Sequence, residues 1–129
     1  MPNIEALDKQ FSLYIRYRDI EDNGYGNCCT CGKLLTVKSG QCGHFISRKQ
    51  MATRFDEQNC GIQCVSCNIF NHGMQLIFGK YIDKKYGAGT ADRILARSRG
   101  TRKFEQFEID ALTKHYQEEA QKLKKLKGL

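Results

Sequence analysis

The sequence contains no tryptophan, a single proline and no long apolar run. No stretch approaches the roughly 20 apolar residues that span a bilayer, and no basic start leads into an apolar stretch with a cleavage site. We therefore expect a cytoplasmic protein, with no membrane partner. Internal repeats and low-complexity linkers are also lacking, and Pro2 lies outside every predicted element. The 129 residues then suit one domain with helical extensions rather than two domains.

Acidic residues are in the minority, since 21 Lys and Arg face 14 Asp and Glu and give a formal net charge of +7. The charge is unevenly distributed. Residues 1–24 carry three basic and five acidic side chains, which leaves +9 for the rest of the chain. A basic body of this kind favours a polyanionic partner, and DNA is the one we expect. Solubility alone is the alternative explanation.

Helical periodicity is clearest at the two ends of the chain. Apolar residues at positions 4, 7, 11, 14 and 15 predict a helix within residues 3–22, with Asn3 as its cap. Apolar positions from 109 to 126 predict an amphipathic helix from 104 to about 127. Two more helices are predicted over 74–87 and 90–100.

The middle of the chain has weaker signals. Short β-prone pieces at 34–37 and 42–46 flank Ser39–Gly40, a pattern typical of a hairpin. Residues 47–63 look irregular apart from an extended piece near 61–63, and a helix is expected to begin soon after Cys67.

Two C-x-x-C pairs give the strongest local signal. Cys28 with Cys31 and Cys64 with Cys67 are separated by 32 residues and can supply four thiolates in a tetrahedron around Zn²⁺. In a cytoplasmic chain, seven cysteines indicate metal binding more than disulfides. A site closed by four sulfurs leaves no position for water, so we expect this zinc to be structural. Reduced core cysteines at this spacing are the alternative. Cys29 could compete with Cys28, but only Cys28 has the two-residue gap to Cys31, and Cys42 and Cys60 are interpreted as small apolar fillers.

A zinc ion held by both pairs would close the intervening stretch into a loop and bring its polar residues against the following helix. The loop supplies His44, Asp56 and Asn59, and the helix supplies Asn68, Asn71 and His72. A neutral imidazole can take a proton from water near pH 7, while oxygen and imidazole ligands can hold a divalent cation beside a phosphate. The set therefore suggests a metal-dependent nuclease site.

The order C-x-x-C, G-H, N, C-x-x-C-N resembles the HNH (ββα-metal) endonuclease module. The segments "CTCG", "CGHFISR", "RFDEQNCGIQCVSCN", "HG" and "YIDKKYG", followed by a basic end helix, resemble the phage lambda NinG (Rap) recombination protein family over roughly residues 10–125. That resemblance implies a bacteriophage protein that acts in a bacterial host as a structure-specific endonuclease on branched intermediates such as D-loops and Holliday junctions. It implies Mg²⁺ or Mn²⁺ as the catalytic cofactor beside structural Zn²⁺.

Carried over to this chain, the resemblance makes His44 the general base and Asn59 the residue that orients it. Asn68 falls where such modules place a metal ligand, and His72 is the second ligand candidate, because it would lie one helical turn further along the same face. Many such modules carry Asp or His just before the base, but Gly43 stands here. The missing ligand is then expected from Gln41, Asp56, His72 or water.

Basic residues near the predicted site and in the later part of the chain are candidates for phosphate contacts that position DNA without reading its sequence. They are Arg48, Lys49, Arg54, Arg97, Arg99, Arg102 and Lys103, with a further lysine-rich run at 122–127. Solvated surface charge is the alternative for each.

These observations together predict an α+β fold. A zinc-bound ββα-metal (HNH/His-Me finger) core over 25–88 is flanked by an N-terminal helix in 1–24 and a basic helical extension over 89–129. The end helix serves either a homodimer or its own domain, and the acidic opening helix either binds a recombination partner or completes the core. Two alternatives to a branch-specific nuclease stay open: a zinc-bound DNA-binding module without catalysis, and an HNH nicking endonuclease without branch specificity.

Overall fold

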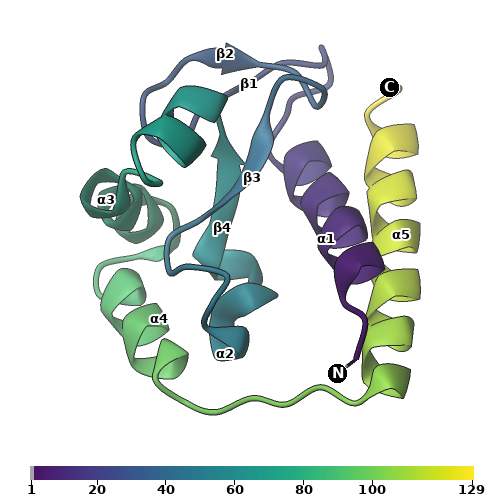
Figure 1. Ribbon diagram of the computed structural model, residues 1–129. Coiled ribbons are helices and arrows are strands. Elements are labelled where there is room, and N and C mark those ends of the chain that lie inside the picture. Colours follow the sequence, from purple (N-terminus) through teal and green to yellow (C-terminus); the bar gives the residue numbers. More distant parts are fainter. Residues whose placement is uncertain (1) are drawn as a thin grey trace.

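A computed structural model describes residues 2–129. Figure 1 shows small sheets between two groups of helices, with α1 and α5 on one side and α3 and α4 on the other. The helices are α1 (Glu5–Arg18), α2 (Met51–Arg54), α3 (Gln75–Tyr86), α4 (Thr90–Ser98) and α5 (Gln106–Leu126), with a 3-10 turn at Glu57–Asn59 and a π-helical turn at Ser66–Phe70. No helix within residues 2–129 has both the length and the apolar character that a bilayer crossing needs.

The strands form two antiparallel pairs. β1 (Gly26–Asn27) pairs with β2 (Leu34–Leu35), and β3 (Gln41–His44) pairs with β4 (Cys60–Gln63). The predicted hairpin across Ser39–Gly40 is therefore wrong. The first C-x-x-C pair forms the connection between β1 and β2, and a tight turn from Thr36 to Gly40 then sends the chain into the second sheet. The extended piece predicted near 61–63 is confirmed as β4.

α1 and α5 lie side by side and run in the same direction (Figure 1). Gln106 Oε1 accepts a hydrogen bond from the Asn3 N–H at 2.9 Å at one end, and Lys127 Nζ donates to the Tyr17 carbonyl at 2.7 Å at the other. The Asn3 side chain also accepts from the Glu5 N–H at 3.0 Å, but the N-cap residue of α1 is Ile4, so the prediction of Asn3 as the cap is wrong by one residue. The amphipathic end helix thus packs on its own domain.

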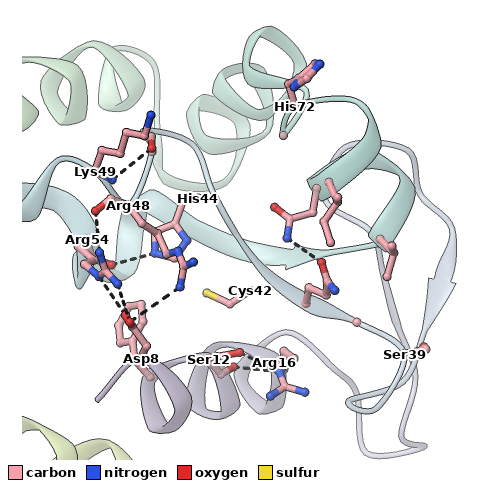
Figure 2. A pocket seen from close by; sticks show the side chains of 18 of the residues that line it. Asp8, Ser12, Arg16, Ser39, Cys42, His44, Arg48, Lys49, Arg54 and His72 are labelled. Atoms are coloured by element: carbon pink, nitrogen blue, oxygen red, sulfur yellow. Dashed lines mark hydrogen bonds and ion pairs between the residues drawn. The ribbon is translucent and has the colours of Figure 1, made fainter. Parts of the chain in front are cut away.

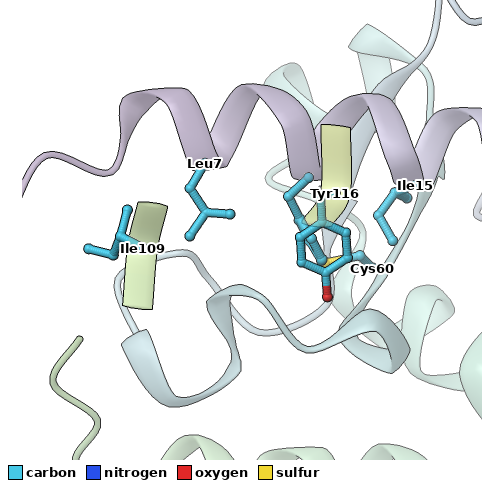
Figure 3. Packing of buried hydrophobic residues seen from close by; sticks show 6 residues of the cluster. Leu7, Ile15, Cys60, Ile109 and Tyr116 are labelled. Carbon is cyan, nitrogen blue, oxygen red and sulfur yellow. The ribbon is translucent and has the colours of Figure 1, made fainter. Parts of the chain in front are cut away.

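One apolar cluster joins all three predicted segments of the chain. Its buried members are Leu7, Phe11, Ile15, Cys60, Ile109 and Tyr116. Figure 3 shows α1 and α5 contributing side chains that meet around Cys60 of β4. Two further clusters surround the cysteine pairs and join α3 to α4. Each residue of this kind that leaves water contributes about 1.5–3 kcal/mol, so α1 and α5 hold the β3–β4 sheet in place from one side.

The fold is α+β with two small two-stranded sheets, and the β3–β4 pair is followed along the chain by the π-helical turn and α3. The stretch predicted to be irregular contains two elements that were not predicted: the short helix α2 and the 3-10 turn at Glu57–Asn59 both lie between β3 and β4. Four residues give too short a pattern for periodicity to detect. The expected helix after Cys67 begins earlier, at Ser66, as a π-helical turn.

Candidate functional site

The four predicted zinc cysteines lie together. The sulfur atoms of Cys28, Cys31, Cys64 and Cys67 are all within 4.8 Å of one another, and Cys31 Sγ lies 3.7 Å from Cys64 Sγ. Backbone N–H groups point at the sulfurs, since the Cys64 N–H donates to Cys28 Sγ at 3.3 Å and the Cys67 N–H donates to Cys64 Sγ at 3.4 Å. Such bonds stabilise thiolates, so the donor set fits a structural Zn²⁺.

The electrostatics of Cys28 agree with that assignment. Burial alone raises the pKa of its thiol, but hydrogen bonds from the Thr30 hydroxyl and from backbone N–H groups outweigh burial and lower that pKa to about 6. The Thr30 hydroxyl in turn accepts a bond from Gln63 Nε2 at 3.0 Å, and the same nitrogen donates to the Gly73 carbonyl at 2.8 Å. Gln63 therefore connects the first cysteine pair to the turn that follows the second.

An open cavity of about 1070 Å³ lies beside β3. α1 forms one wall and the Ser66–Phe70 turn with the following loop forms the other, as Figure 2 shows. Five basic side chains and one carboxylate line it: Arg16, Lys38, Arg48, Lys49 and Arg54 against Asp8. A cavity with this charge balance attracts phosphate groups.

His44 lines this cavity at the end of β3. Its Nε2 lies 2.9 Å from the Arg54 carbonyl oxygen. A carbonyl only accepts, so Nε2 carries the proton in the neutral ring and Nδ1 keeps a free lone pair. Burial lowers the pKa of His44 below its ordinary value of 6.5, and the nearby positive charges of Arg48 and Arg54 lower it further. The ring is therefore neutral near pH 7, which a general base requires.

Asn59 does not hold the His44 ring directly. The side chain is fully buried, its Oδ1 accepts from the Ile46 N–H at 2.8 Å, and its Nδ2 donates to the carbonyls of Ile46 and Thr53 at 3.0 Å. These bonds fix the backbone just after His44 and the carbonyl next to the one that His44 contacts. Asn59 is thus a positioning residue, and the direct partner of His44 is a backbone carbonyl that the sequence could not identify.

The two proposed metal ligands, Asn68 and His72, also line the cavity. Asn68 Nδ2 donates to Gln41 Oε1 at 2.8 Å, which leaves the Asn68 amide oxygen free to face a cation. The prediction that His72 lies one helical turn beyond Asn68 is wrong, because the π-helical turn ends at Phe70 and His72 lies in a loop with a left-handed backbone (φ 53°). His72 nonetheless lines the same cavity, although its ring points away from His44 in Figure 2.

Gly43 and Asp56 are accounted for structurally. A Cβ atom at Gly43 would clash with the Gln63 side chain, so the position before His44 has no room for a metal-binding side chain. Asp56 does not line the cavity; it caps the 3-10 turn by accepting from the Gln58 N–H and it accepts from Arg97 at 2.7 Å. Of the sources expected for the missing ligand, Asp56 therefore does not serve, while Gln41 and His72 both line the cavity.

The predicted phosphate-binding residues separate into two groups. Arg48, Lys49 and Arg54 line the cavity, but Arg54 is held by two bonds to Asp8 at 3.0 and 2.5 Å and is only 16% exposed. The other four (Arg97, Arg99, Arg102 and Lys103) do not line it. Arg97 is paired with Asp56, and Arg102 is paired with Glu108 at 2.7 Å while it stacks on Phe104.

Nothing in the sequence indicated the contribution of α1. Asp8, Ser12 and Arg16 line the cavity on one face of this helix, and the adjacent face packs in the core. Their four-residue spacing placed them on a common face, but nothing in the sequence showed that this face meets β3.

No curated protein and no solved structure matches this chain. The family described as bacteriophage lambda NinG protein matches residues 3–127, nearly the whole chain, including the cysteine pairs, the cavity and the end helix. With that extent of agreement, the chain belongs to the bacteriophage lambda NinG protein family.

Proposed function

We propose that this protein is a divalent-metal-dependent DNA endonuclease that hydrolyses phosphodiester bonds in branched recombination intermediates such as D-loops and Holliday junctions. Its family is one of recombination-related phage proteins. The observation that carries the proposal is the state of His44: a neutral imidazole, bonded through Nε2 to the Arg54 carbonyl, at the wall of a cavity lined by basic side chains.

In the proposed reaction, Nδ1 of His44 takes a proton from a water molecule in the cavity. The water oxygen attacks the phosphorus atom, and the bond between phosphorus and the leaving sugar oxygen breaks. Arg48 and Lys49 hold the flanking phosphates, while Arg54 fixes the wall through Asp8. The leaving oxygen takes up a proton from solvent to become a hydroxyl, and the protonated imidazole returns its own proton to solvent.

Mg²⁺ or Mn²⁺ would neutralise negative charge on the phosphate and the leaving oxygen. The Asn68 amide oxygen and the His72 imidazole are the donors that we propose for it. Both line the cavity, and neither makes a hydrogen bond to another residue within 2–129. Such a sparse protein ligand set suits Mg²⁺, which keeps several waters and binds phosphate oxygens.

A non-catalytic, zinc-bound DNA-binding module is the second candidate, and one observation favours it. Within residues 2–129, Asp8 is the only carboxylate that lines the cavity, and Arg54 already binds both of its oxygens. A cation in the cavity would therefore have no free carboxylate, whereas phosphate binding needs none.

The deciding experiment is a cleavage assay on a D-loop, a four-way junction and a plain duplex of matched sequence, each with Mg²⁺ or Mn²⁺. Wild type is compared with His44→Ala and His44→Gln, and His115→Ala is the matched control because His115 is a surface histidine of α5 outside the cavity. We expect both His44 variants to lose about 10²–10⁴-fold in rate while they keep their zinc content and DNA affinity.

The outcomes separate the candidates. Cutting of branched substrates that only the His44 variants lose supports the proposal. Equal cutting of the plain duplex points to a nicking endonuclease without branch specificity. Binding without cutting by wild type, in either metal, leaves the DNA-binding module, and full activity of His44→Gln removes His44 as the base.

A further inference from the structure

A second group of metal-binding side chains lies outside the four-cysteine cluster. The ligand atoms of Cys42, His44 and Cys60 are all within 4.8 Å of one another. The register of the second sheet explains this, because His44 pairs directly with Cys60 and Cys42 lies two residues before His44 on the same face. The same sheet that presents His44 thus surrounds it with two thiols.

These three side chains suit a borderline-soft cation. Zn²⁺ binds cysteine sulfur at about 2.3 Å and histidine nitrogen at about 2.0–2.1 Å in tetrahedral geometry, so two bound sulfurs lie about 3.8 Å apart. The ligand atoms therefore need to move together by about 1 Å or less. Mg²⁺ and Mn²⁺ prefer oxygen ligands, so two thiols select against the cations proposed for cleavage.

The position of the group leaves one coordination site open. Cys42 and His44 line the cavity, while Cys60 is 0% exposed beneath them. Three protein ligands with a fourth position facing solvent is the arrangement of a zinc that can exchange. The four-cysteine cluster, in contrast, has no open position.

The hydrogen bond of His44 adds an independent argument. Histidines that bind metals usually donate their second ring N–H to a carboxylate or a backbone carbonyl, which fixes the ring and raises the basicity of the coordinating nitrogen. His44 has this arrangement, with Nε2 at 2.9 Å from the Arg54 carbonyl. The nitrogen left for a metal is Nδ1, the same atom that would take the proton in cleavage.

We propose that Cys42, His44 and Cys60 form a second zinc site, and that zinc bound there switches cleavage off. On binding, each thiol releases its proton to solvent and Nδ1 donates its lone pair to the metal. The base is then unable to accept a proton from water. The binding site stands on the geometry alone, whereas the inhibition rests on the proposed nuclease function.

The binding claim is tested by titrating full-length, zinc-loaded protein with Co²⁺ or Zn²⁺ and following thiolate-to-cobalt absorption and metal content. Cys42→Ser removes a proposed ligand. Cys29→Ser is the matched control, because Cys29 is also a partly buried cysteine but belongs to neither group. Loss of an outer partner of a metal ligand already weakens binding roughly 10–100-fold.

We therefore expect wild type and Cys29→Ser to take up a second equivalent, and Cys42→Ser and His44→Gln to bind it at least about tenfold more weakly. Saturation of wild type at a single equivalent overturns the site. So does an unchanged second equivalent in Cys42→Ser.

Inhibition is tested by adding zinc to the Mg²⁺-dependent cleavage reaction. Each zinc-loaded protein is compared with its own cleavage rate in the absence of added zinc. Cys42→Ser should need at least about tenfold more zinc for half inhibition than wild type and Cys29→Ser. Equal inhibition of all three means that zinc acts elsewhere and overturns the switch. If no protein cleaves DNA, the nuclease proposal fails, while the metal titration still decides whether the second site exists.

Discussion

Removal of the Asn59 side chain should destabilise the protein far more than removal of an exposed asparagine. Asn59 is 0% exposed and makes three hydrogen bonds of 2.8–3.0 Å, to the N–H and carbonyl of Ile46 and to the carbonyl of Thr53. Asn59→Ala leaves the Ile46 N–H and the Ile46 carbonyl without partners, whereas the Thr53 carbonyl still accepts from the Asp56 N–H. Each unpaired group costs about 1–3 kcal/mol, so about 1.5 kcal/mol for each of the two gives a loss of about 3 kcal/mol.

The assay is urea denaturation at pH 7 with zinc present. With a slope of about 2 kcal/mol per molar urea, a loss of about 3 kcal/mol lowers the midpoint by roughly 1.5 M. Asn71→Ala is the matched control. The Asn71 side chain is exposed and its hydrogen bonds go to Ser66, so we expect the free energy of unfolding to change by no more than about 0.5 kcal/mol.

Asn59→Asp sharpens the test. One carboxylate oxygen can still accept from the Ile46 N–H, but the other replaces a donor and faces the carbonyls of Ile46 and Thr53. We expect it to be at least as destabilising as Asn59→Ala at pH 7. A midpoint for Asn59→Ala that matches that of Asn71→Ala would refute the view that Asn59 holds this part of the fold.

Three further predictions concern pH, zinc and charge. Because burial lowers the pKa of His44 in the folded state, the stability that the neutral ring contributes should be fully present above pH 6.5 and should decline as the pH falls from 6.5 towards the folded-state pKa. His44→Gln should remove that decline in urea midpoints. The acid limb of kcat/KM should also lie below pH 6.5. Cys31→Ser, at an exposed position, should lower the free energy of unfolding by less than about 0.5 kcal/mol if the cysteines only fill space. It should lower it by several kcal/mol if zinc joins the four cysteines, and a strong chelator should then destabilise wild type but not this variant. Arg48→Gln, at a side chain that is 60% exposed, should reduce by about 1 the slope of log affinity for DNA against log salt concentration, and should leave stability unchanged. Arg54→Gln breaks the pair with Asp8 and should lower the free energy of unfolding in urea by about 1.5–3 kcal/mol.

The two terminal helices show what local pattern can predict. Leu7, Phe11 and Ile15 repeat every four residues and are buried on one face of α1, as the periodicity indicated. Ile109, Tyr116 and Ala120, spaced by seven and four residues, are likewise buried on one face of α5. The pattern said nothing about what each face meets, and the parallel packing of the two helices became visible only in the structure.

Strand pairing shows the limit of the same reasoning. Ser39 and Gly40 looked like a hairpin turn, yet the strands on either side of them belong to different sheets. β3 pairs instead with β4, across a connection that contains α2. Short β-prone segments carry little register information of their own, so the partner was decided by distant contacts.

The sequence by itself determined the two cysteine pairs and the amphipathic end helices, and it singled out His44 as a candidate, because these depend on residue type and on spacing along a few turns of chain. Tertiary structure alone decided that the Arg54 carbonyl holds His44, that Asp8 of α1 holds Arg54, and that Gln63 fills the space beside Gly43. It also brought Cys60 beside Cys42 and His44. Each of these contacts joins residues from different elements, and backbone carbonyls have no sequence signature, so no local periodicity records them.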